Sequence, residues 1–473
     1  MIALLAAACS STEPAREPGT LAVGVTEPAS LLPGAVTDLP GRMITGALWT
    51  PLVTYDAEKQ QVTPLAAAAI TSQDQVVWTI QLRPGARFHD GSPVTAASYV
   101  DTWKAGLAEH WPGATVLTDV LRAKDMRAAN DSTITLTLSQ PFAAAPLALG
   151  STALLPLPPS VLQSHDWAGF AKHPVGNGPY KLAEPWNKGG KLIKADTYQG
   201  PNPGNARVIE LRVLDPAAQH AGVRSGSLDL ATAVPGAAHD AMQRDFPGRH
   251  LTWPLPSMTY LSIPLSDKRF ADPTVRHAIA LAVDRGAMET GPLEHQVDVA
   301  RSLLPPSVAL AQRPGPCRPC NADPTAAKAL LDQSGTLTGP VNLYSSGAPW
   351  AQALADQLHK ALGLEVAVRS ERSGDGPAIV TRQLFTPSPR EPLINLPGYG
   401  SPAFDDLLAS ADAATTPADS GQLYRVAENQ VLRDLPVIPL WSAHGHAVWG
   451  SRVSGIRTDP YRAIELEQLT VSR

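Results

Sequence analysis

The chain has 473 residues, of which 44% are hydrophobic and 17% charged, so it is a globular chain rather than a disordered one. This length suggests two or three domains. The formal net charge is only −5 and there is no long basic run, so nucleic-acid binding has no electrostatic support. The 46 prolines predict many short elements joined by stiff turns.

The N-terminus reads MIALLAAACSSTEPAREPG, a short apolar run followed by a cysteine and a polar tether. Residues 5–9, LAAAC, resemble the lipobox of bacterial lipoproteins, in which the cysteine is acylated, so we predict lipidation of Cys9. The run is too short to span a bilayer, which favours a signal remnant over a membrane helix. No Lys or Arg precedes Cys9, which indicates a misplaced start codon or a missing upstream part; a chance Ala-rich start is the alternative. We expect an exported protein, anchored on the outer face of the cytoplasmic membrane or located in the periplasm.

Two further cysteines, Cys317 and Cys320, lie in the loop GPCRPCNAD. Two cysteines alone do not make a four-ligand zinc site, and no obvious histidine flanks them. Outside the cytoplasm we expect a local disulfide that stiffens the loop, with a redox-active pair as the alternative.

The first half of the chain predicts strands joined by turns. Residues 20–26 (TLAVGVT) and 76–82 (VVWTIQL) alternate like strands. Thr95 can cap a helix that carries apolar residues at helical spacing. The loop PVGNGPYKL (174–182) lacks the spacing of a phosphate-binding loop, so we assign it no nucleotide.

Between the second strand and this helix, His89 stands beside Asp90 in the order that a catalytic pair would have. Asp90-Gly91 is, however, typical of a turn, and this accounts for the local pattern without catalysis. We therefore interpret His89 as a side chain that faces solvent.

The second half predicts helices that alternate with strands, which indicates α/β lobes. Asp-Pro pairs at 272–273 and 323–324 each supply an N-cap and a first-turn proline. Further helices are expected from Pro349, Ser401-Pro402 and about Pro417, and strands at 364–370 and 435–441.

We find no G-x-S-x-G elbow, Walker A loop or H-E-x-x-H motif in the sequence. The nearest metal candidate is His444-Gly445-His446, where two imidazoles on a strand would share one face. Without a nearby cysteine or acidic cluster, we interpret them as surface histidines. The sequence predicts a binding protein rather than an enzyme, with no metal and no cofactor.

Several motifs, in sequence order, resemble the extracellular solute-binding proteins of family 5, the dipeptide- and oligopeptide-binding lipoproteins of peptide ABC importers. They are VTEPASLLPG (25–34), ALWTPLVTYD (47–56), LRPGARFHDGSPVTAASYVDTW (82–103), PVGNGPYKL (174–182), RSGSLDLA (224–231), FADPTVRHAIALAVDR (270–285), YGSPAFDDLLASA (399–411) and LPVIPLW (435–441).

The resemblance implies an α/β fold of the periplasmic-binding-protein-like type II (cluster C) class, with two hinged lobes and an extra subdomain. The implied domains are a signal remnant, lipobox and tether (1–19), a discontinuous lobe I (20–46, 171–258 and 441–473), the extra subdomain (47–170) and lobe II (259–440).

The resemblance also implies that a monomer grips an extended peptide in the interlobe cleft through its main chain and delivers it to ABC permease subunits. The membrane would be contacted through the lipid anchor only. Five residues match motifs near the ligand in relatives, with core packing as the alternative for each: Glu27, Tyr260, Leu261, Tyr399 and Trp441.

The chain departs from the family in residues 369–398. Relatives carry there an aspartate, in a W…DYPDP-like stretch, which binds the amine of the ligand, and this stretch is missing. Glu391 is our candidate substitute and Asp375 a further one. The departure leaves two alternatives open: a transport-inactive member that acts as an envelope scaffold or regulator, and a binder of a non-peptide ligand.

Overall fold

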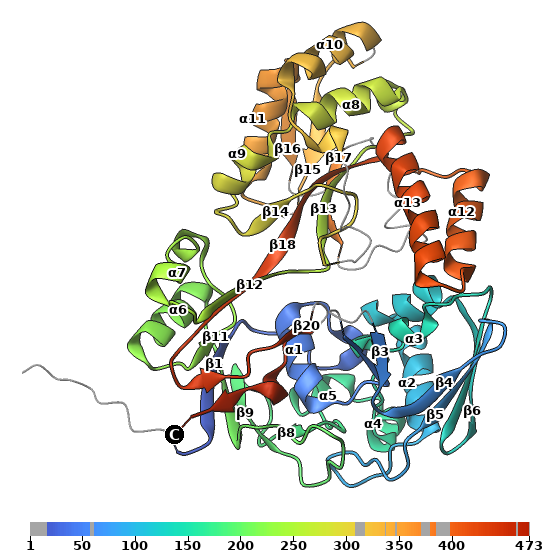
Figure 1. The fold of residues 1–473 in the computed structure, drawn as a ribbon, viewed down its shortest axis with the longest axis vertical. Helices are drawn as coiled ribbons and strands as arrows, with labels where there is room; N and C mark the ends of the chain where they lie inside the picture. Colours follow the sequence, from blue (N-terminus) through green and yellow to red (C-terminus); the bar gives the residue numbers. More distant parts are fainter. Residues whose placement is uncertain are drawn as a thin grey trace, which may run out of the picture.

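The computed structural model describes residues 17–56, 61–307, 317–335, 337–345, 348–369, the backbone of 379–384, 398–459 and 462–472. Within them the chain forms two lobes, one above the other in Figure 1. None of the helices that the structure describes combines the length and the apolar character needed to cross a bilayer.

One sheet extends through both lobes. Its strands are β1 (Thr20–Val25), β8 (Tyr180–Leu182), β9 (Gly189–Lys194), β10 (Val208–Val213), β11 (Leu230–Ala231), β12 (His250–Pro254), β13 (Met258–Ser262), β14 (Val297–Val299), β15 (Val341–Tyr344), β16 (Val366–Arg369), β17 (Ile379–Leu384) and β18 (Val437–Trp449). In the described residues their order is β16-β15-β17-β13-β18-β11-β1-β10-β9-β8, and β12 and β14 also pair with β18.

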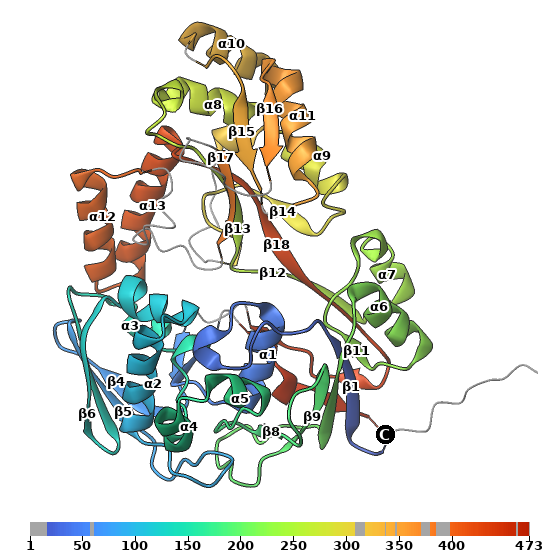
Figure 2. The same ribbon diagram turned by 180° about the vertical axis from the view of Figure 1, so that it is seen from behind.

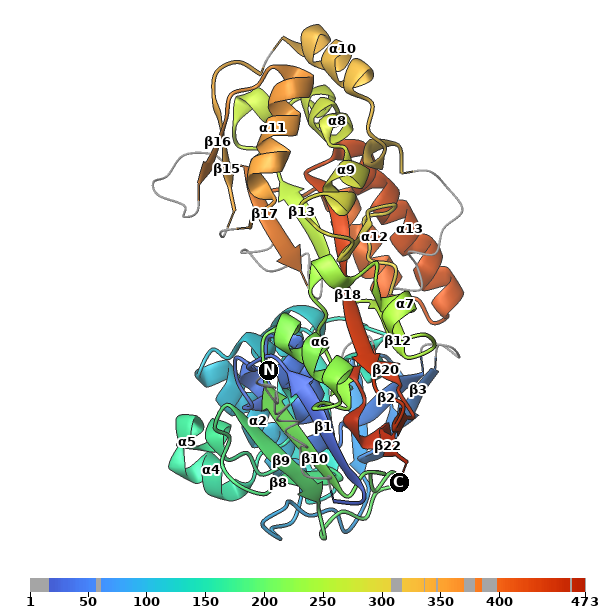
Figure 3. The same ribbon diagram turned by 90° about the vertical axis from the view of Figure 1, so that its left-hand side faces the viewer.

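The long strand β18 is the element that joins the lobes. Its first half pairs with β13 and β14, and its second half pairs with β12 and β11. Figure 3 shows β18 descending from the upper lobe into the lower one beside β12. The strand expected at 435–441 is therefore confirmed, but it continues through the histidines to Trp449.

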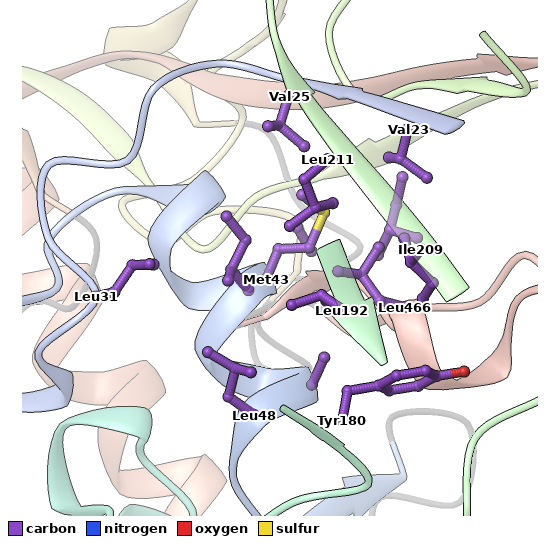
Figure 4. Packing of buried hydrophobic residues seen from close by; sticks show 14 of the residues in the cluster. Val23, Val25, Leu31, Met43, Leu48, Tyr180, Leu192, Ile209, Leu211 and Leu466 are labelled. Carbon is purple, nitrogen blue, oxygen red and sulfur yellow. The ribbon is translucent and has the colours of Figure 1, made fainter. Parts of the chain in front are cut away.

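In the lower lobe, β1 lies between β10 and β11 and is parallel to both. All six residues of β1, including Thr20, are buried, as expected for a central parallel strand that is covered on both faces, and so the strand does not alternate between a buried and an exposed face. Helix α1 (Leu39–Leu48) packs against this sheet, and the carboxylate of its N-cap Asp38 accepts a hydrogen bond from the Gly41 N–H. Figure 4 shows Leu466, from the C-terminal segment, in the same core as Met43 of α1.

A second sheet, with strand order β4-β5-β7-β6, forms its own core within residues 47–170. Its strands are β4 (Ala67–Thr71), β5 (Val77–Leu82), β6 (Ala123–Asn130) and β7 (Thr133–Leu138), and β2 (Val53–Asp56) pairs with β3 (Gln61–Pro64) nearby. Figure 2 shows α2 (Ala96–Ala108) beside this sheet. Thr95 caps α2, as predicted, in a capping box with Ser98.

The upper lobe contains the helices that the sequence predicts best. They are α8 (Pro273–Ala282), α9 (Arg285–Thr290), α10 (Pro324–Ser334), α11 (Ala351–Leu362), α12 (Pro402–Ala413) and α13 (Pro417–Asp434). The Asp-Pro starts are confirmed, because the carboxylates of Asp272 and Asp323 accept hydrogen bonds from the first turns of α8 and α10. Gly335 and Gly363 end α10 and α11 in the left-handed conformation.

Five more α-helices are described. They are α3 (Ala145–Ala148), α4 (Pro159–Ser164), α5 (Trp167–Lys172), α6 (Pro216–Ser225) and α7 (Met242–Asp245). The C-terminal segment adds two small strand pairs to the lower lobe, formed by β19 (Val453–Ser454) with β22 (Thr470–Val471) and β20 (Thr458–Asp459) with β21 (Ala463–Ile464). The described core has its three largest clusters in the two lobes and the small sheet, while the boundaries expected for the domains stay a prediction.

The lobes also meet away from β18, where the hairpin of α12 and α13 reaches the small sheet (Figure 1). Arg122 Nη2 lies 2.6 Å from Asp412 Oδ2, and each side chain is only 10% exposed. The Ala143 N–H donates to the Asp412 carbonyl at 2.9 Å, and the Tyr424 hydroxyl donates to the Asp412 carboxylate. We call this set the Arg122–Asp412 contact.

Cys317 and Cys320 are joined by a disulfide with an S–S distance of 2.03 Å. Both are buried against Met258 and Tyr260 of β13. The Arg285 guanidinium donates to the Cys320 carbonyl at 3.0 Å and so fixes this loop on the upper lobe.

The interpretation of His89 as a solvent-facing side chain was wrong, because the ring points into the protein and joins two family motifs. Its Nδ1 accepts a hydrogen bond from the Gly176 N–H, and its Nε2 donates to the Gly178 carbonyl, both at 3.1 Å. Only the neutral ring with its proton on Nε2 satisfies both bonds. Burial lowers the pKa of His89 to about 4. His89 therefore has a structural role: its ring holds the loop that contains Gly176 and Gly178.

We expect acid to weaken these two hydrogen bonds. The folded-state pKa of His89, about 4, lies below the ordinary value of 6.5, so between these pH values the unfolded chain binds more protons than the folded one. The free energy of unfolding should then fall as the pH drops from 6.5 to 4, by at most about 3 kcal/mol for this residue. In thermal unfolding, His89→Gln should lose part of this pH dependence, whereas the exposed His173→Gln should keep it. If the stabilities of wild type and His89→Gln change equally with pH, His89 does not form the two hydrogen bonds in its neutral state as described.

Candidate ligand-binding site

A cavity of about 250 Å³ lies where β18 passes from one lobe to the other. Its wall includes Thr26, which follows β1, and Thr232, which follows β11. These two strands are parallel, so the cavity lies at their carboxyl ends, where open α/β sheets bind their ligands. The rest of the polar wall is formed by Trp253 of β12, Gln296 before β14, and His444 and His446 of β18.

Gly445 allows the indole of Trp253 to lie directly on β18. The two residues face each other in the β12–β18 pair. A Cβ at position 445 would lie 2.2 Å from the indole ring, so any side chain there would displace it. Since neighbouring residues of a strand point to opposite faces, the indole lies on one face of β18 and the side chains of His444 and His446 lie on the other.

The interpretation of His444 and His446 as surface histidines was wrong. His446 is 4% exposed, and the side chain of His444 is 12% exposed. With His239 and His295 they form a chain of ring contacts: the ring centroids lie 5.8 Å apart for His239–His295, 5.0 Å for His239–His446 and 5.6 Å for His444–His446. Burial, together with the neighbouring His239 and His444, lowers the pKa of His446 to about 3, so its ring is neutral at ordinary pH.

Carboxylates lie behind these histidines. Asp298 Oδ2 is 2.6 Å from His444 Nε2, and this hydrogen bond lowers the pKa of Asp298. Asp240 lies 3.5 Å from His239 and 3.8 Å from His295. Within the described residues, however, no group of three or more His, Cys, Asp or Glu side chains is arranged to hold a metal ion.

Of the predicted ligand residues, Glu27 is the chain neighbour of Thr26, which lines the cavity, but Glu27 is not itself a lining residue. Glu27 is exposed, and its Oε1 accepts a hydrogen bond from Trp186 Nε1 at 2.8 Å. The bond fixes the carboxylate and leaves its other oxygen for a ligand.

Tyr260, Leu261 and Trp441 have their side chains in the upper lobe. The Tyr260 hydroxyl donates to the Leu303 carbonyl at 2.5 Å, Leu261 is fully buried, and Trp441 packs edge-on against Trp350. The backbone of β13, which carries the first two, is paired on one side with β17 and on the other with β18. A peptide added as a strand would need a different edge, and the ligand contacts of these residues stay a prediction.

The hydroxyl of Tyr399 donates to Asp434 Oδ2 at 2.7 Å, and Gln430 Nε2 donates to that hydroxyl at 3.1 Å. This network packs α13 against the residues before α12. The candidates Glu391 and Cys9 lie outside the described residues, as does Asp375.

Sequence reasoning missed Trp253 and Gln296. Neither belongs to a motif, and each reaches the cavity only because its segment pairs with β18 or adjoins a strand that does. The available signal was Gly445, since a glycine inside a strand often marks the close approach of another group.

Two lobes that share strand β18, with a cavity where that strand crosses between them, are the arrangement that the resemblance implied. The family model of bacterial extracellular solute-binding proteins, family 5 (middle), matches residues 61–389. The chain belongs to this family, whose members bind substrates for ABC transporters and are not enzymes. The expected two-lobed type II fold is confirmed.

Individual relatives agree with this assignment. The glutathione-binding protein GsiB of Escherichia coli O157:H7 is 26% identical over 455 residues, which cover 87% of this chain and 86% of GsiB. DppA from Helicobacter pylori, solved with the peptide STSA, matches with a TM-score of 0.79 at 21% identity, over 96% of this chain and 98% of DppA. HbpA2 from Haemophilus parasuis matches with a TM-score of 0.80 at 18% identity, over 96% and 100%.

Proposed function

We propose that the chain is the lipid-anchored extracellular solute-binding component of an ABC importer, which captures dipeptides or oligopeptides between its lobes as a monomer and delivers them to the permease. The observation that carries this proposal is the cavity at the crossing of β18, because residues from segments that pair with both halves of β18 form its wall. A ligand that contacts both sides of the cavity favours the closed arrangement of the lobes. A permease can then distinguish the closed, loaded protein from the open one.

Two findings support peptides as the ligand class. The relatives include a protein named for glutathione binding and one solved with a bound peptide. In this chain, Glu27 follows the cavity-lining Thr26 and offers a carboxylate held by Trp186, which suits the ammonium group of a peptide. This carboxylate would take the place of the aspartate in the family's W…DYPDP-like stretch, which is missing from residues 369–398.

The test is calorimetric titration with mixed dipeptides to pentapeptides. We expect saturable binding, and we expect Glu27→Gln to weaken it by about tenfold or more, because a hydrogen bond to a charged group is lost. The glutamine still accepts the Trp186 bond, so the variant should fold normally. Glu184→Gln, an exposed control, should bind like wild type.

A protein that binds no peptide, together with normal peptide uptake when it is deleted, would contradict the proposal and favour the scaffold alternative. The anchor is tested separately by incorporation of labelled palmitate into the full-length precursor, which should be lost in Cys9→Ser.

A further inference from the structure

A short segment of the lower lobe, residues 236–240, contacts a turn of the upper lobe, residues 291–296. The segment follows β11, and Met242 just beyond it is buried in a cluster with Ala22 of β1. The turn joins α9 to β14, and Met288 of α9 is buried in the core of the upper lobe. Figure 1 shows α7, which follows the segment, below α9. A contact between the segment and the turn is therefore a contact between the lobes.

The two segments touch at Gly236 and at His239. A Cβ at position 236 would lie 2.0 Å from Glu294 Oε2, so any side chain there would displace the glutamate. The rings of His239 and His295 are stacked, with centroids 5.8 Å apart and an angle of 15° between their planes. This packing places two imidazoles from different lobes face to face.

Carboxylates lie beside the upper of these two histidines. His295 Nδ1 is 3.4 Å from Glu289 Oε1, and its Nε2 is 3.8 Å from Asp240 Oδ2 of the lower lobe. A charged His295 ring would thus have an acidic group near each nitrogen, one on each lobe. Asp240 Oδ1 is also 3.5 Å from His239 Nδ1, but the Asp240 side chain is 79% exposed, so water weakens its effect.

A positive charge on His239 is less well matched. Besides Asp240, its ring contacts imidazoles: the stacked ring of His295, and His446 of β18, whose ring centroid is 5.0 Å away. His444 lies beyond His446 on the same strand. Burial lowers the pKa of His239; Asp240 raises it in part, and His295 and His444 lower it further. The contact therefore favours the neutral ring of His239.

We propose that this contact is a pH-sensitive link between the lobes, which holds while His239 is neutral and weakens in acid when His239 becomes charged beside His295 and His446. Moving the lobes apart exposes His239 and removes the facing ring of His295, so the separated lobes bind a proton more readily. The carboxylate of Asp298, on β14, is bonded to His444 and not to His239. The link is thus complete above the ordinary histidine pKa of 6.5 and is lost as the pH falls from there towards the lowered pKa.

The first test needs no ligand. The titration of His239 is followed by NMR in ¹³C-histidine-labelled protein, and its signal is identified by its loss in His239→Gln. We expect a pKa below 6.5 in wild type and a value nearer 6.5 in Gly236→Val, because valine displaces Glu294 and separates the two segments. Gly400→Val is the matched control, since a Cβ at position 400 meets nothing within 4 Å, and it should titrate like wild type.

Equal pKa values of His239 in wild type and Gly236→Val would overturn the proposal. If Gly236→Val does not fold, His295→Gln takes its place, because loss of the facing imidazole should also raise the pKa of His239.

The second test is calorimetric titration with trialanine at about pH 7 and about pH 5.5, between which its two terminal groups largely keep their charges. We expect wild type to bind about threefold or more weakly at the lower pH, and His239→Gln to lose most of this difference. The exposed His173→Gln should keep it. Asp240→Asn should enlarge it, because a charged His295 then lacks its carboxylate on the lower lobe. The same ratio of affinities in all four proteins would overturn the link between this contact and ligand capture.

This consequence for affinity rests on the proposed function, whereas the contact itself does not. If trialanine and other peptides bind at neither pH, the peptide function fails, and the titration of His239 still decides whether the contact is sensitive to pH. If peptides bind equally well at both pH values and the pKa of His239 is the same in wild type and Gly236→Val, the link fails and the peptide function stands.

Discussion

Gly176→Ala should lower the free energy of unfolding by about 3 kcal/mol or more, the largest effect that we expect from adding one methyl group. A Cβ at position 176 would lie 1.9 Å from the carbonyl oxygen of Leu48, a contact that real Cβ atoms do not make. The neighbours are backbone atoms at the end of α1, and His89 holds the other side of the loop, so neither side yields easily. Thermal or urea unfolding of the purified variant measures the effect.

The control is Gly286→Ala in α9, where the nearest atom to the added Cβ is 3.5 Å away. Alanine is the better helix former, so this variant should be as stable as wild type or slightly more stable. If Gly176→Ala unfolds with the same midpoint as Gly286→Ala, the loop is not packed against α1 as described.

Asp412→Asn should open the protein and weaken ligand binding. The Arg122–Asp412 contact joins the α12–α13 hairpin to the small sheet, at a distance along the fold from β18. Asparagine has nearly the same shape but no charge, and it leaves the Arg122 guanidinium largely buried without its carboxylate. A loss of about 1.4 kcal/mol from the closed arrangement corresponds to about tenfold weaker binding. Small-angle scattering should show a larger radius of gyration without ligand.

Asp406→Asn provides the matched control, because Asp406 is exposed on the same helix. It should alter neither the radius of gyration nor the affinity for trialanine. An Asp412→Asn protein with the dimensions and affinity of wild type would show that the contact does not hold the lobes together.

Local patterns in the sequence predicted the local elements well. Helices α8 and α10 start at Asp-Pro pairs, as predicted, because caps depend on neighbours along the chain. Strand β5 and helix α2 follow from alternation and from the Thr95 cap for the same reason. The resemblance to the family supplied the two-lobed arrangement, which no local pattern contains.

The surroundings of His89 and His446 could not be predicted from local sequence patterns. Nothing near His89 in the sequence indicates the main chain of Gly176 and Gly178, which it contacts across the fold. His446 looked like a surface residue because the ring that it contacts, His239, comes from a segment about 200 residues away. Cavity walls assembled from distant segments need the tertiary structure.

The C-terminal segment has a consequence for how the polypeptide acquires its shape. Leu466 and Leu469 are fully buried in a core that also contains Leu21 and Val23 of β1. The core around β1 therefore cannot form completely until the C-terminal segment has been synthesised. Such a topology favours export ahead of folding, since a nascent lower lobe lacks its final pieces until translation ends. A chain truncated before residue 453 should therefore be degraded or aggregate, rather than persist as a smaller binding protein.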